Sequence, residues 1–138
     1  MTASHKNKTF ATFLATIFGG VGLHRFYLHG SKDFWGWIHA ATLALSLLLY
    51  LARPEQPLMF SFLPFVLSAL AALLAALVIG LTADEQWDAR HNPHSGRHSA
   101  SGWPLAVLLV LAFGVGAIGL TATIARMFDL LYTGGAFG

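Results

Sequence analysis

The sequence contains no cysteine and few charged residues. Without cysteine, the chain can form no disulfide, thiolate metal site or cysteine nucleophile. Only 10% of the residues are charged, against about 25% in an average soluble protein. The formal net charge is +2 and the basic residues are scattered, so the sequence lacks the basic stripe that nucleic-acid binding requires.

Apolar residues, in contrast, are abundant. They make up 56% of the chain, and the mean hydropathy is +0.64. A soluble domain of 138 residues could not bury so much apolar surface, so we expect the lipid bilayer to surround this protein. An all-helical membrane protein satisfies its backbone hydrogen bonds within each helix and needs no disulfides.

Four apolar runs account for most of this composition. They are Phe10–Leu23, Phe34–Ala52, Leu58–Leu81 and Trp103–Ala125. A helix that spans the bilayer needs about 20 apolar residues. The first run reaches that length only if its helix extends from near Thr9 to Leu28.

We therefore predict an all-α integral membrane protein, a bundle of four transmembrane helices with both termini on one side. The alternative is three spans plus a short re-entrant or interfacial first helix. Because proline is tolerated in the first helical turn, Pro64 predicts that the regular part of the third helix begins near Leu63. This order divides the chain into a helical hairpin at residues 6–52 and a second helix pair at 53–132, with a polar loop at 82–102.

In the four-span arrangement, aromatic and histidine side chains gather on the face opposite the termini. Tryptophan favours the membrane interface, which agrees with this distribution. The histidines on this face are His24, His29, His39, His91, His94 and His98. Lysine and arginine are divided equally between the two faces, so the positive-inside rule does not orient the four-span bundle. Lys6 and Lys8, before the first helix, favour cytoplasmic termini.

A stripe of small residues follows one face of the third run. Ala72, Ala76 and Gly80 are spaced four apart, as in helices that approach closely in membranes. The stripe predicts a packing face, either within the bundle or between copies of the chain. We therefore expect a homo-oligomer or a complex with another membrane protein, in addition to contact with the lipid bilayer.

The segment G-G-V-G-L-H-R-F-Y-L-H-G, at residues 19–30, interrupts the apolar pattern of the first 50 residues. Gly19, Gly20 and Gly22 allow the helix end to pack closely or to break. Gly30 permits a positive φ where the chain reverses. The segment is therefore expected to form the turn that sets the register of the first helix pair.

The polar and aromatic residues of this segment suggest a second role. Arg25 is too costly at the bilayer centre, so it must lie at the interface, pair with an acid or bind phosphate. Phe26 and Tyr27 are typical anchors at headgroup depth. Together with His24, these residues form a candidate docking site for a partner protein or a lipid headgroup. No nucleophile–base or carboxylate pair accompanies them, so we predict no catalytic site.

The same residues resemble the TM2-domain family of membrane proteins. The resemblance covers Lys6 to Leu51 and is carried by Gly20, Gly22, His24, Arg25, Phe26, Tyr27, Leu28 and Gly30. His24 stands where many family members carry aspartate, and His29 is an insertion before Gly30. The resemblance implies an integral membrane protein without an established catalytic activity. In animal members of the family the connection between the paired helices is drawn on the cytoplasmic side, which is opposite to the orientation that Lys6 and Lys8 favour.

The loop after the third run carries acidic and histidine side chains. If the helix continues into it, Asp84, Asp88 and His91 lie on one face, and His94 and His98 follow a proline. Carboxylates and imidazoles together are suitable ligands for Zn²⁺ or Ni²⁺. The spacing matches no closed ligand motif, and the asparagine, proline, serine and glycine residues favour a solvated loop. A third interpretation is that protonated histidines strengthen binding to anionic lipid.

These patterns predict a non-enzymatic, multi-pass integral membrane protein that acts through helix–helix assembly with itself or a membrane partner. The alternatives are a small oligomeric transporter or channel and a pH- or metal-responsive accessory protein. An intramembrane enzyme is disfavoured because the spans show no carboxylate pair and no serine–histidine pair at matching depth. We expect no cofactor and no small-molecule substrate, and we predict a bacterial cytoplasmic membrane as the location.

Overall fold

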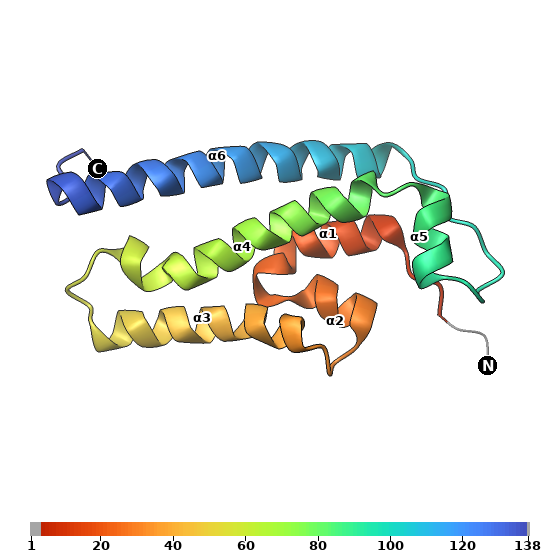
Figure 1. Ribbon diagram of the computed structural model, residues 1–138, viewed down its shortest axis with the longest axis horizontal. Coiled ribbons are helices and arrows are strands. Elements are labelled where there is room, and N and C mark those ends of the chain that lie inside the picture. The colour runs from red at the N-terminus through yellow and green to blue at the C-terminus, as the bar shows by residue number, and fades with distance from the viewer. Residues whose placement is uncertain (1–3, 138) are drawn as a thin grey trace.

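The computed structural model describes residues 4–137, and helices are the only regular elements among them (Figure 1). This confirms the all-α prediction. The elements, in chain order, are α1 (Lys8–Phe18), the 3₁₀ turn η1 (Gly19–Val21), α2 (Leu23–His29), α3 (Phe34–Ala52), α4 (Leu58–Leu81), α5 (Asp84–His91) and α6 (Trp103–Thr133). Gly30 has a φ of +88°, which confirms the expected reversal at that residue.

Within the described residues 4–137, three helices are long and apolar enough to cross a membrane, not four. They are α3, α4 and α6, with 19, 24 and 31 residues. Helix α1 has only 11 residues and rises about 16 Å, roughly half of the hydrocarbon core. The prediction of four transmembrane helices is therefore wrong, and the alternative with three spans and a short first helix agrees with the structure.

The first helix fails to span because the chain turns back at η1. Helix α2 then runs back beside α1 (Figure 1). The start of α1 lies at the same end of the bundle as α5, and the two termini lie at opposite ends. Two hydrogen bonds join the returning segment to the amino-terminal one, from Lys6 Nζ to Tyr27 O at 2.8 Å and from Asn7 N to Tyr27 Oη at 2.8 Å. The predicted placement of both termini on one side is therefore wrong as well.

Glycine makes this turn possible. A Cβ on Gly19 would overlap the side chain of Ala72 in α4, and Gly22 has a φ of +82°. A Cβ on Gly22 would also lie 2.5 Å from the carbonyl oxygen of Gly36 in α3. The turn is therefore pressed against two spanning helices at positions where only glycine fits.

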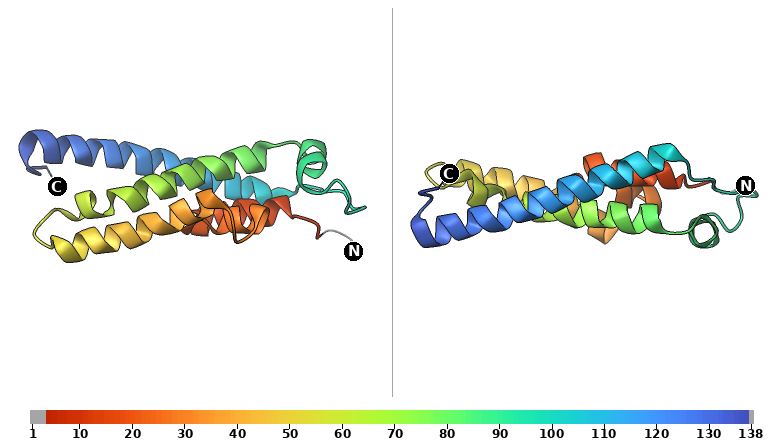
Figure 2. Two further views of the ribbon diagram at one scale, coloured as in Figure 1. Left: turned by 60° about the horizontal axis from the view of Figure 1, so that its bottom comes forward. Right: turned by 90° about the horizontal axis from the view of Figure 1, so that it is seen from above.

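Helix α4 is the centre of the bundle and packs against α1, α3 and α6 (Figure 2). Ala72 and Ala76 are buried, and a Cβ on Gly80 would meet Leu109 of α6 at 2.5 Å. Ala15 of α1 joins the same buried cluster. The small-residue stripe is therefore a contact within one chain, which decides between the two readings that the sequence left open.

Helix α4 begins earlier than predicted. It starts at Leu58, so Pro64 lies inside it rather than in its first turn. The backbone N–H of Phe65, next to the proline, donates to Ser46 Oγ of α3 at 3.1 Å. A side chain from a neighbouring helix thus supports the backbone where proline disturbs it, as happens in membrane bundles.

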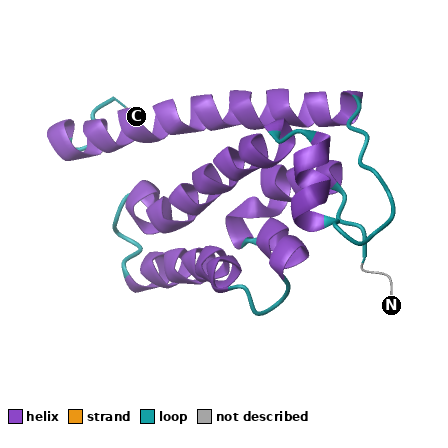
Figure 3. Cartoon of the chain, turned by 45° about the vertical axis from the view of Figure 1, so that its right-hand side comes forward, coloured by secondary structure: helices purple, strands orange, loops and turns teal. Residues whose placement is uncertain are grey.

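The segment predicted as an irregular polar loop contains a helix. Helix α5 lies across the end of the bundle and is followed by the extended segment that leads to α6 (Figure 3). Its first turn carries Asp84 and Glu85, and its last turn carries Arg90 and His91. This charge order complements the helix dipole and stabilises a short helix that composition alone does not predict.

Candidate functional site

The glycine-rich segment at residues 19–30 forms a compact turn and short helix whose side chains are held by specific partners. Arg25 donates twice to Asp33, from Nε to Oδ2 at 3.0 Å and from Nη2 to Oδ1 at 2.9 Å. Asp33 Oδ2 also accepts the N–H of Gly36 at 2.7 Å and thereby caps α3. The hydrogen bonds from Arg25 are the main cause of a lowered pKa of Asp33. The pair joins the first turn of α2 to the residue that precedes α3.

The two aromatic residues of the predicted docking site are used inside the chain. Phe26 packs edge-to-face on Trp37, with ring centroids 5.3 Å apart, and lies over Gly36. Tyr27 packs edge-to-face on Phe10 at 5.0 Å, and Lys6 Nζ lies 4.8 Å from its ring centroid. Phe26 therefore faces α3 and Tyr27 faces α1, so the structure does not bring them to one common surface.

His24 lies inside the hairpin and is 1% exposed. The centroid of its ring is 5.5 Å from that of His39, and its Nδ1 has no hydrogen-bond partner among residues 4–137. His39 Nδ1 lies 2.6 Å from Ser68 Oγ, and Ser68 donates its hydroxyl proton to the carbonyl of Gly20 at 2.7 Å. The expectation that no serine–histidine pair shares one depth is therefore wrong.

This serine–histidine pair is arranged for structure rather than for nucleophilic attack. The hydroxyl has one proton, and that proton is given to Gly20, so His39 Nδ1–H must be the donor to Ser68. An activated serine needs the opposite polarity, with the histidine as acceptor. Ser68 thus donates to the Gly20 carbonyl, which lies in the 3₁₀ turn η1 and outside the regular α-helical hydrogen bonding. Ser68 lies four residues before Ala72 and so continues the small-residue stripe. This spacing was the only indication in the sequence that Ser68 faces another segment of the chain.

The amino-terminal segment is docked onto α5 by a second polar network. Lys8 is 5% exposed, and its Nζ lies 2.5 Å from Asp84 Oδ1 and 2.7 Å from the carbonyl oxygen of Thr82. Trp87 Nε1 donates to Lys6 O at 2.9 Å, and Asn92 Oδ1 accepts the Lys6 N–H at 2.6 Å. Hydrogen bonds from Lys8 and then Ser101 lower the pKa of Asp84 to about 2.

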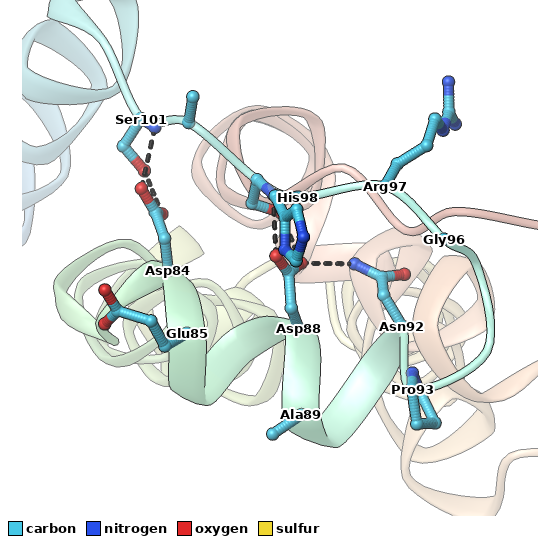
Figure 4. A pocket seen from close by; sticks show the side chains of 12 residues that line it. Asp84, Glu85, Asp88, Ala89, Asn92, Pro93, Gly96, Arg97, His98 and Ser101 are labelled. Atoms are coloured by element: carbon cyan, nitrogen blue, oxygen red, sulfur yellow. Dashed lines mark hydrogen bonds between the residues drawn. The ribbon is translucent and has the colours of Figure 1, made fainter.

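The predicted metal ligands have other partners. Asp84 accepts two hydrogen bonds from Ser101, and Asp88 accepts them from Ser99 and Asn92, which lowers the pKa of Asp88 to about 2 (Figure 4). His91 instead packs on Trp87 at 4.1 Å. Within residues 4–137, no three histidine or carboxylate side chains are grouped as a metal ion would need.

The histidines are also less uniform than the pH interpretation assumes. His24 is buried, His39 is half-buried and bonded to Ser68, and burial lowers the pKa of His91. His29, His94 and His98 are exposed. Protonation of all six near pH 6, which the pH interpretation assumes, is therefore not expected.

Comparisons of the sequence with protein-family models, with curated proteins and with solved structures found no match. The resemblance of residues 6–51 to the TM2-domain family therefore stays a prediction. The structure supports a multi-pass membrane protein through its three long apolar helices.

Proposed function

We propose that this chain is a non-enzymatic, multi-pass membrane protein that acts by assembling with a second copy or with another membrane protein. The supporting observation is that two of its three long helices bury few of their residues within the chain. In the most apolar window of α3 and of α6, only 11% of the residues are buried within the chain, compared with 28% in α4. One chain therefore leaves most of α3 and α6 to lipid or to a neighbour.

The small-residue stripe does not provide the contact for assembly, because it is already used within the chain. Both α3 and α6 keep exposed apolar faces, and we propose the face of the longer helix, α6, where Val110, Phe113 and Ile118 are exposed. Non-enzymatic action is supported by the polar side chains of the bundle. Ser68 gives its proton to a backbone carbonyl, and Asp84 and Asp88 accept hydrogen bonds from serines, as a structural role requires.

The distribution of basic residues between the two ends of the bundle supports an orientation in the membrane. Six of the eight lysine and arginine residues lie at the end of the bundle that carries α5, which we call the polar end. They are Lys6, Lys8, Arg25, Lys32, Arg90 and Arg97, whereas Arg53 and Arg126 lie at the other end. The positive-inside rule therefore places the polar end in the cytoplasm. The bacterial cytoplasmic membrane stays our proposed location.

Cysteine cross-linking tests the assembly, because the native chain contains no cysteine. Single cysteines replace Val110, Phe113 and Ile118, and buried Ala112→Cys is the matched control on the same helix. We expect oxidation in native membranes to give a dimer, or an adduct of one defined larger mass, from at least one exposed position and none from Ala112→Cys. Monomer at all three exposed positions would contradict assembly through α6.

A further inference from the structure

A groove of about 420 Å³ lies between α2, α4 and α5 and combines an apolar wall with a basic end. Its wall comes from α4, where Ala71, Leu74 and Val78 repeat at the spacing of one helix face. Arg25 and His29 of α2 and Arg90 and His91 of α5 line its other parts. The volume is within the range of about 300–1,000 Å³ that is typical of ligand sites.

We propose that this groove, which we call the basic groove, binds one anionic phospholipid. The phosphate lies against Arg90 and Arg25, and an acyl chain follows the α4 wall. The proposal does not depend on assembly of the protein, because all the groove residues belong to one chain. With the polar end in the cytoplasm, the bound lipid belongs to the cytoplasmic leaflet.

The apolar wall faces the bilayer. Leu74 and Val78 are 64% and 62% exposed, although they belong to the most apolar of the three long helices. Ala71 to Val78 covers about 10 Å along the helix axis, enough to hold the first part of an acyl chain. The side of the groove is therefore open in the direction from which a lipid arrives, and α2 and α5 limit it elsewhere.

The basic end of the groove is complementary to a phosphodiester. No aspartate or glutamate lines the groove, and Arg90 has no ion-pair partner within residues 4–137. Arg25 is paired with Asp33 through Nε and Nη2, which neutralises its charge but fixes the direction of its remaining N–H groups. Arg90 thus supplies the uncompensated charge and Arg25 a preoriented donor.

The histidines complete the site as hydrogen-bond donors. The rings of His29 and His91 are 6.4 Å apart, so one phosphate can lie within reach of both. Burial lowers the pKa of His91, and we therefore assign to it a neutral N–H donor rather than a charge at neutral pH. A headgroup with one negative charge is the ligand that these four side chains fit best, in contrast to a zwitterionic one.

The test measures which lipid stays bound to the full-length protein. The protein is reconstituted in nanodiscs of phosphatidylcholine with a minor fraction of phosphatidylglycerol, released into detergent and examined by native mass spectrometry. We expect the retained lipid to be enriched in phosphatidylglycerol. Arg90→Gln should lower that retention about fivefold, the effect of one interfacial basic residue. Arg97→Gln is the charge-matched control, because Arg97 lies at the same end outside the groove, and it should change retention less than twofold.

Two further experiments test whether the apolar wall contributes to binding and whether free phosphate competes with the lipid. Val78→Trp fills the groove at an exposed position and should lower retention without lowering the thermal midpoint of the protein. Inorganic phosphate should displace no more lipid than chloride at equal ionic strength. Equal retention of both lipids by the parent protein, equal effects of Arg90→Gln and Arg97→Gln, no effect of Val78→Trp, or displacement by inorganic phosphate would each overturn the proposal.

Discussion

Lys8 Nζ lies 2.5 Å from Asp84 Oδ1, and this ion pair joins the start of α1 to the start of α5. The hairpin and two long helices separate the two residues in the sequence. A lysine that is 5% exposed needs such a partner, because an unpaired buried ammonium is strongly destabilising. The pair therefore holds the amino terminus at the polar end, and with it the direction in which α1 runs.

The first prediction concerns acid. Asp84 has a folded pKa of about 2, below its ordinary value of 3.8, so its contribution to stability is fully present above pH 4. That contribution is lost as the pH falls from about 4 to about 2, because the unfolded chain binds the proton first. We expect the thermal midpoint in detergent to fall over this window. Asp84→Asn should lower the midpoint at pH 7. The midpoint of this variant should then fall less than that of the parent protein between pH 4 and pH 2.

Glu85→Gln is the control for this experiment. Glu85 is the neighbouring residue in the same helical turn, it is exposed, and it forms no ion pair within residues 4–137. Its substitution removes only an exposed charge at the start of α5, so it should change the midpoint at pH 7 and the acid profile much less than Asp84→Asn does. An Asp84→Asn variant with the profile of the parent protein would show that the Lys8 pair does not stabilise the fold.

The second prediction concerns the close approach of η1 to α4. Gly19 has ordinary helical dihedral angles, so Gly19→Ala tests space alone, and the new methyl would overlap Ala72. We expect a loss of about 1–3 kcal/mol in the free energy of unfolding. Gly114→Ala, at a helical position with open space, should be neutral or slightly stabilising. Similar values for the two variants, measured by denaturation in detergent, would mean that η1 is not pressed against α4.

The third prediction concerns Pro64. Ser46→Ala removes the acceptor for the Phe65 N–H and should cost about 1–3 kcal/mol, the usual effect of an unsatisfied buried polar group. In a Pro64→Ala background the same substitution should cost much less, because the helix can then bond that N–H itself. A double-mutant cycle measures the difference. Additive effects of the two substitutions would rule out this compensation between α3 and α4.

The fourth prediction concerns sidedness. Single cysteines at Ser4, Glu55 and Arg97 are placed at exposed positions and treated with an impermeant maleimide in intact cells. Only Glu55→Cys should react, whereas Ser4→Cys and Arg97→Cys should react after permeabilisation. Reaction of Ser4→Cys together with Glu55→Cys would restore the four-span arrangement. The reverse pattern would keep three spans and invert our orientation.

The sequence by itself determined the long helices. Apolar runs Phe34–Ala52 and Leu58–Leu81 coincide with α3 and α4, and Gly102 and Pro104 mark the start of α6. Hydropathy succeeds here because the bilayer allows only segments that satisfy their own backbone hydrogen bonds. The reversal at Gly30 also follows from local properties, since glycine accepts the φ of +88° that the turn needs.

Only the tertiary structure decided what the first helix does. Whether α1 continues or turns back depends on Ala72 and Gly36, which lie far along the chain and leave room for a glycine turn and nothing larger. The uses of Ser68 and Asp84 depend in the same way on the Gly20 carbonyl and the Lys8 ammonium. Such contacts between distant segments have no signal in local composition, and for that reason the number of spans, the position of the amino terminus and the basic groove could be found only in the folded chain.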